Sequence, residues 1–158
     1  MKVFISHHSS DSAIAAKISA RLLSQHRVLS YLDVVDPHIG RNGEDLADHI
    51  RSQMGSCDHL IAVVSFNTRA SQWVPWEIGV ATEKEFPLAT YSEMISDMPE
   101  FLVAWPRLRS MTDLDTYVAA SQAGQRTYTA KRSMFTETAA HRAGTRAFYT
   151  EIRRRLGQ

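Results

Sequence analysis

Short apolar runs recur along the first half of the chain and are separated by longer stretches with a different period. Runs of this kind are typical of strands that are buried on both faces of a parallel sheet. The pattern predicts four strands, over residues 2–6, 28–35, 59–65 and 88–91.

The stretches between these runs have the spacing of helices, because their apolar residues recur at every fourth position. The two clearest stripes are Ile14, Ile18 and Leu22, and then Leu46, Ile50 and Met54. Asp11 or Ser12 is a suitable N-cap for the first helix, and Ser71 for a third helix predicted over residues 72–85.

Strands that alternate with helices predict an α/β fold. We expect a parallel sheet that is covered by helices on both faces, in a single domain over residues 1–158. The last third is less regular. Residues 101–105 are predicted as an apolar strand or a packed loop, residues 112–120 as a short helix, and Phe148, Ile152 and Leu156 as the core face of a C-terminal helix.

Composition narrows the function classes. A hydrophobic content of 44% and a charged content of 22% are those of a soluble globular domain, and a net charge of +1 argues against a dedicated nucleic-acid binder. No apolar run approaches the roughly 20 residues that span a bilayer, so we expect no membrane partner. One cysteine and no apparent secretory signal predict a cytoplasmic protein, and seven scattered histidines without ligand spacing predict no metal.

Topology alone indicates where a ligand would bind. In open parallel sheets, ligands lie beyond the carboxyl ends of the strands, at the point where the strand order reverses. In a flavodoxin-like order this point lies between the first and third strands. The segments that leave those strands are residues 6–11 and 65–77, and both are rich in polar side chains.

Trp73 and Glu77 are the most informative pair in these segments. They lie four residues apart, so on a helix they share one face. A carboxylate in such apolar surroundings can stabilise a developing positive charge. Two interpretations stay open on spacing alone, because Trp73 and Trp76 also suit core positions and Glu77 also favours a helix N-terminus.

Several segments together resemble the TIR (Toll/interleukin-1 receptor) domain family. Residues 3–6 followed by Asp11 resemble its first strand and loop, and residues 32–33 with the loop 36–43 resemble its second strand and BB loop. Residues 60–65 resemble its third strand, and residues 71–77 are similar to its S-x-W-x-x-x-E signature. Trp76 is bulkier than that pattern, and residues 92–132 match no part of it.

The resemblance implies an α/β fold of the flavodoxin-like class, a three-layer sandwich with a central, mostly parallel five-stranded sheet. It also implies a free-standing bacterial enzyme that cleaves the nicotinamide glycosidic bond of NAD. Glu77 corresponds to the catalytic glutamate of the family. NAD is then the substrate, and no cofactor is expected. The residues implied to bind it are Phe4, Ser6, His7, His8, Asp33 and Trp73.

The resemblance also implies how such a protein acts in the cell. Its partners would be other TIR domains, bound through an assembly loop that contains Pro37, Ile39 and Gly40. The product would be ADP-ribose, a cyclic isomer or a conjugate, and in anti-phage defence it would activate a separate effector. Two alternatives stay open: a non-catalytic scaffold that works by self-association, and an enzyme related to nucleoside deoxyribosyltransferases, which also use a glutamate.

Overall fold

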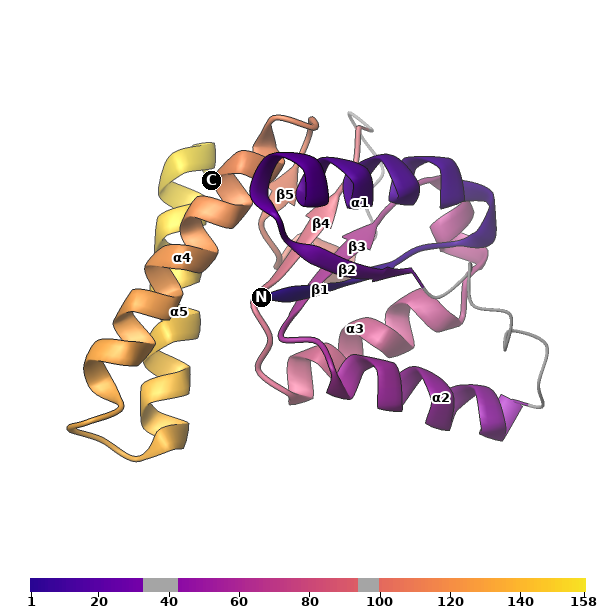
Figure 1. The fold of residues 1–158 in the computed structure, drawn as a ribbon. Helices are drawn as coiled ribbons and strands as arrows, with labels where there is room; N and C mark the ends of the chain where they lie inside the picture. The colour runs from indigo at the N-terminus through magenta and orange to yellow at the C-terminus, as the bar shows by residue number, and fades with distance from the viewer. Residues whose placement is uncertain (33–42, 94–99) are drawn as a thin grey trace.

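The strands of the computed structural model form one parallel sheet in the order β2-β1-β3-β4-β5 (Figure 1). The structure describes residues 1–32, 43–93 and 100–158. The strands are β1 (Lys2–Ser6), β2 (Leu29–Leu32), β3 (His59–Val63), β4 (Leu88–Tyr91) and β5 (Arg107–Leu108). The predicted flavodoxin-like sheet is therefore confirmed, and it is parallel throughout.

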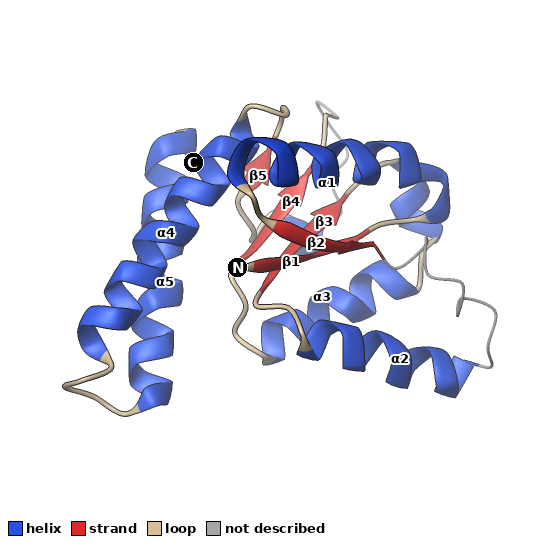
Figure 2. Cartoon of the chain, viewed as in Figure 1, coloured by secondary structure: helices blue, strands red, loops and turns tan. Residues whose placement is uncertain are grey.

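Helices cover both faces of this sheet, as the alternating pattern predicts (Figure 2). They are α1 (Ser12–His26), α2 (Gly43–Gly55), α3 (Trp73–Glu83), α4 (Asp113–Lys131) and α5 (Glu137–Leu156). Short 3-10 helices span Ser9–Asp11, Phe66–Ala70 and Glu100–Leu102. All three predicted helical segments of the first half are present, and so are the four predicted strands, within the residues that the structure describes.

The two faces of β1 belong to two separate cores, because successive side chains of a strand point in opposite directions. Val3 and Ile5 pack in a core that includes residues of α1, α4 and α5. Phe4 packs with residues of α2 and α3 on the other face. This alternation also fixes the direction of Ser6, which lies on the same face as Phe4.

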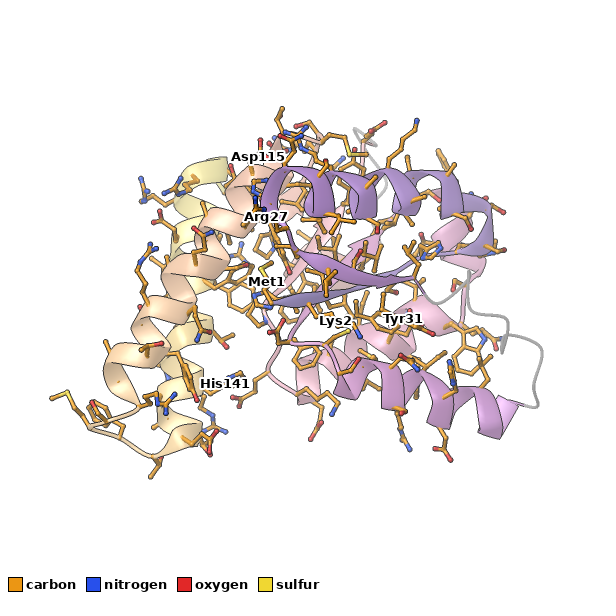
Figure 3. All side chains as sticks on the ribbon, in the orientation of Figure 1. Met1, Lys2, Arg27, Tyr31, Asp115 and His141 are labelled. Atoms are coloured by element: carbon orange, nitrogen blue, oxygen red, sulfur yellow. The ribbon has the colours of Figure 1, made fainter. Side chains whose placement is uncertain are left out.

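Helices α4 and α5 form an antiparallel hairpin at the edge of the sheet where the strands begin (Figure 1). One end of the hairpin, which carries Asp115 (Figure 3), is tied to α1. Arg21 and His26 of α1 each contact the Asp115 carboxylate at 2.7 Å. These hydrogen bonds lower the pKa of Asp115, although burial opposes the shift, and the bond from Arg21 has the larger effect. The other end projects beyond the sheet, and His141 lies on that part (Figure 3).

The last third agrees with the sequence prediction in part. Of the two alternatives for residues 101–105, the strand is wrong: the segment forms the end of a 3-10 helix and a turn, and Leu102 packs in the core, so it is closer to the predicted packed loop. The last strand lies at Arg107–Leu108. The helix predicted over residues 112–120 continues to Lys131. No apolar stripe in the sequence marks this extension, because α4 and α5 contact each other there through Gly124 and Gly144. The two helix backbones approach closely at this point: a Cβ on Gly124 would lie 2.8 Å from the Gly144 carbonyl oxygen.

Candidate functional site

The carboxyl ends of β1 and β3 lie side by side, because these two strands pair in register from Val3 with His59 to Ser6 with Ala62. The chain leaves β1 towards β2 on one side, and it leaves β3 towards β4 on the other. The reversal of strand order predicted from the sequence is therefore present. The loops that leave these two strands form the candidate site.

A hydrogen bond between Ser6 and Glu77 lies at the centre of this edge. The Ser6 hydroxyl donates to Oε2 of Glu77, and both side chains are buried. Ser6 ends β1 and faces α3, while Glu77 lies in the second turn of that helix. The structure thus brings together two predicted site residues that are 71 positions apart in the sequence.

Glu77 occupies a core position of α3. The buried residues of this helix are Val74, Glu77, Ile78 and Ala81, which have the spacing of one helix face. Burying a carboxylate among apolar side chains is costly unless hydrogen bonds compensate, and Ser6 supplies one of them. A charged residue at such a costly position is a candidate for a functional role.

The two histidines after β1 have different environments. His7 is buried, and its Nδ1 donates to the carbonyl oxygen of Ile5 at 3.0 Å. His8 is half-buried, and its Nδ1 accepts from the backbone N–H of Ser10 at 3.2 Å, which caps the first 3-10 helix. His8 therefore lies nearer to solvent. Contact of either histidine with a nucleotide stays a prediction.

Asp11 joins the two loops of the site. Its carboxylate accepts from the Ser65 hydroxyl at 2.7 Å and from the Asn67 side-chain amide at 3.1 Å. Ser65 and Thr68 form a capping box that begins the 3-10 helix after β3. The usual capping-box motif does not predict this one, because Thr68 stands where that motif has glutamate or glutamine. The sequence predicts Asp11 or Ser12 as the N-cap of α1. Asp11 occupies the N-cap position, but its side chain makes no cap hydrogen bond to this helix.

The aromatic residues near Glu77 divide between surface and core. Trp73 is 36% exposed and contacts Trp76 edge to face, with ring centroids 5.6 Å apart. Trp76 is half-buried and packs against the core that contains Phe4 and residues of α2 and α3, so it is the more buried of the two tryptophans. Phe4 is fully buried and contacts Tyr31. Its placement is that of a core residue, and a contact with substrate stays a prediction.

Four predicted residues lie outside the described part of the chain: Asp33, Pro37, Ile39 and Gly40. The remaining site residues lie in described segments. Among those segments, no group of three or more histidine, cysteine or acidic side chains is arranged to hold a metal ion. No helix there combines the length and apolar character that crossing a bilayer requires.

Comparison with known proteins identifies relatives of this fold. A family model described as "TIR domain" matches residues 3–120. Among solved structures, the chain is similar to the TIR domain of the Toll-related receptor TRR-2 from Hydra magnipapillata, with 12% identity and a TM-score of 0.56. The match covers 72% of this chain and 89% of that chain, and at this identity it shows the fold alone. A search of curated proteins found no match.

Proposed function

The chain belongs to the TIR domain family, and we propose that it is an enzyme that cleaves the nicotinamide glycosidic bond of NAD. The observation that carries this proposal is the buried Glu77 carboxylate, held by the Ser6 hydroxyl where the strand order reverses. Open α/β sheets bind their ligands at this place. A purely structural glutamate would be expected on the surface of α3 instead of on its core stripe.

One carboxylate is sufficient for this reaction. Cleavage of an ordinary glycoside needs an acid to protonate the leaving group and a second carboxylate. Nicotinamide is a pyridinium in NAD, so it leaves as a neutral ring when the bond electrons pass to its nitrogen. The remaining task is to stabilise the oxocarbenium-like transition state, which a fixed anion such as Glu77 can do.

The nucleophile that attacks the anomeric carbon decides the product. Attack of water on the anomeric carbon, with loss of a proton to solvent, gives ADP-ribose. Attack by another atom of the same molecule gives a cyclic isomer, and attack by a different small nucleophile gives a conjugate. We propose that the product acts as a signal for a separate effector in anti-phage defence, in the cytoplasm.

Access to Glu77 connects catalysis with assembly. The carboxylate is 0% exposed, so a ribose hydroxyl reaches it only after the covering residues have moved. Self-association is general in this family, and we propose that contact between TIR domains opens the site. Trp73, exposed one turn before Glu77 on α3, is then positioned to contact the nucleotide.

The decisive experiment is incubation of the purified protein with NAD, with the products resolved by chromatography at several protein concentrations. We expect nicotinamide to appear together with one ADP-ribose product, at a rate per molecule that rises with concentration. Failure to consume NAD at any concentration would reject the enzyme and leave the scaffold. Transfer between a deoxynucleoside and a free base, with no NAD consumption, would instead support the deoxyribosyltransferase alternative.

A further inference from the structure

A pocket lies at the opposite end of the strands from Glu77. It forms where α5 passes the end of α3 and the segments that lead into β4 and β5, and its volume is about 310 Å³. Ser6 and Glu77 lie at the carboxyl ends of the strands, whereas Phe86 in this pocket lies two residues before the start of β4. A ligand in this pocket therefore occupies a different site from the substrate.

Three half-buried aromatic residues form the floor of this pocket: Phe86, Trp105 and Tyr149. The Trp105 and Tyr149 rings are tilted by 36° with centroids 6.0 Å apart. The Tyr149 hydroxyl is used within the protein, because it donates to the Phe86 carbonyl at 3.2 Å and accepts from the Leu88 N–H at 3.1 Å. The floor thus presents ring surfaces to a ligand.

Two arginines of α5 stand at the rim, one turn apart. Arg142 is occupied, since its Nε donates to the Glu85 carboxylate at 2.8 Å. Arg146 is exposed, lines the same pocket and makes no ion pair with a carboxylate of the described residues. Arg146 is therefore the cation that is available to an anionic ligand.

The walls of the pocket are fixed from several directions. Glu85 has a φ of 55°, a left-handed conformation that favours glycine at a helix end. The hairpin holds it there, because Thr145 donates to the Glu85 carbonyl at 3.2 Å and Arg142 holds its carboxylate. Arg153 donates to the carbonyl of Ala104 at 2.6 Å and so restrains the segment of Trp105. The pocket is preformed, which lowers the entropic cost of binding.

We propose that this pocket binds a small planar aromatic molecule that carries one anionic group. The ring would lie against Trp105 and Tyr149, and the anion would accept hydrogen bonds from Arg146. A volume of about 310 Å³ is at the small end of ligand pockets, which suits one ring system and one charged group. An aromatic carboxylate and the phosphate of a mononucleotide share this chemistry.

Trp105 provides a direct reporter for this binding. The chain has three tryptophans, so a Trp73→Phe, Trp76→Phe protein leaves Trp105 as the only one. Its fluorescence is titrated with adenosine monophosphate, 4-hydroxybenzoate, adenosine and inorganic phosphate. We expect a saturable change with at least one of the two aromatic anions, and weaker binding of adenosine and of phosphate.

The charge requirement is tested with a matched pair of variants. Arg146→Glu should weaken binding of the aromatic anion about tenfold or more, the effect of losing one charge-assisted contact. Arg126→Glu, the same reversal on an exposed position of α4 outside the pocket, should leave binding unchanged. Circular dichroism verifies that both variants fold, and calorimetry on the unmodified chain replaces fluorescence if the tryptophan substitutions unfold it.

Each result bears on the proposal. Saturable binding of the monophosphate alone identifies a nucleotide site, and binding of 4-hydroxybenzoate alone identifies an aromatic acid site. No saturable binding of either anion overturns the proposal. Adenosine binding as tightly as its monophosphate, or equal weakening by Arg146→Glu and Arg126→Glu, overturns the role of Arg146. None of these outcomes depends on NAD cleavage.

Discussion

Replacing Glu77 with glutamine tests the proposed catalytic carboxylate with the smallest change of shape. The glutamine oxygen can still accept from the Ser6 hydroxyl, so the hydrogen bond seen in the structure is retained and the charge alone is lost. A unit charge about 4 Å from a developing cation contributes about 4 kcal/mol at an effective dielectric constant of about 20. Because each 1.36 kcal/mol is tenfold in rate, we expect NAD turnover to fall about 1000-fold.

The thermal stability of the Glu77→Gln protein should stay the same or rise, although its turnover falls. Glu77 is 0% exposed, so the folded protein bears the cost of burying its charge. Removing a buried charge while keeping its hydrogen bond is often neutral or stabilising. We therefore expect a thermal midpoint equal to or above that of the unmodified chain, together with the loss of turnover.

The assay is NAD consumption followed by chromatography, with thermal unfolding measured on the same samples. Glu83→Gln makes the same chemical change at an exposed position of the same helix, and it should retain full turnover. A Glu77→Gln protein that consumes NAD within about tenfold of the control rate would refute the electrostatic argument. A loss of turnover accompanied by unfolding would show that Glu77 is needed for the fold and would not support catalysis.

The other predictions concern the aromatic pair, assembly, the hairpin and acid stability. Trp73→Ala should impair NAD turnover while costing less than the about 3–5 kcal/mol of a buried tryptophan, since Trp73 is 36% exposed; unfolding with unchanged turnover per folded molecule would contradict this. Ile39→Asp should lower NAD turnover without unfolding the protein, because it opposes burial of the loop between subunits. A turnover rate per molecule that does not change with protein concentration or with this variant would show that the monomer alone has a complete active site. Gly124→Ala should lower the free energy of unfolding by about 1–3 kcal/mol in denaturant titrations. Gly79→Ala is the control and should not lower it, because a Cβ added at Gly79 has no neighbour within 4 Å. Equal effects of the two substitutions would argue against close packing of the hairpin. Burial opposes ionisation of Asp58, but hydrogen bonds from His59 and the Lys2 N–H lower its pKa to about 2. The ionised carboxylate should therefore contribute about 1 kcal/mol to the free energy of unfolding above pH 4, after solvent screening, and this contribution should be lost as the pH falls towards 2. Asp58→Asn should reduce the pH dependence of stability in this range, and an unchanged acid unfolding transition would exclude the contribution.

The sequence determined the sheet and the edge at which to look for a site. Strands buried on both faces need continuous apolar runs, and their helices need a four-residue spacing, so residues such as Ile5, Ile18 and Ile61 indicate their elements locally. The strand order was a condition taken from the flavodoxin-like class, and the structure confirms it. These rules identified the loops after β1 and β3 before any distance was known.

The sequence pattern indicated both helices of the hairpin, but not the full length of α4 or how α4 and α5 pack on each other. This packing depends on Gly124 and Gly144, and a glycine contact leaves no apolar stripe to detect. The pocket beside α5 was equally hidden. Its lining comes from α3, α5 and the segments before β4 and β5, which only the folded chain brings together.

Glu77 shows the same division within the site. The sequence placed it four residues after Trp73 on a helix, but it left open whether that helix turned Glu77 to solvent or to the core. The tertiary structure decided this, because α3 packs on the sheet through Val74, Ile78 and Ala81 and so carries Glu77 inwards to the Ser6 hydroxyl. Local spacing fixes which residues share a helix face, whereas the direction of that face is set by contacts between residues far apart in the chain.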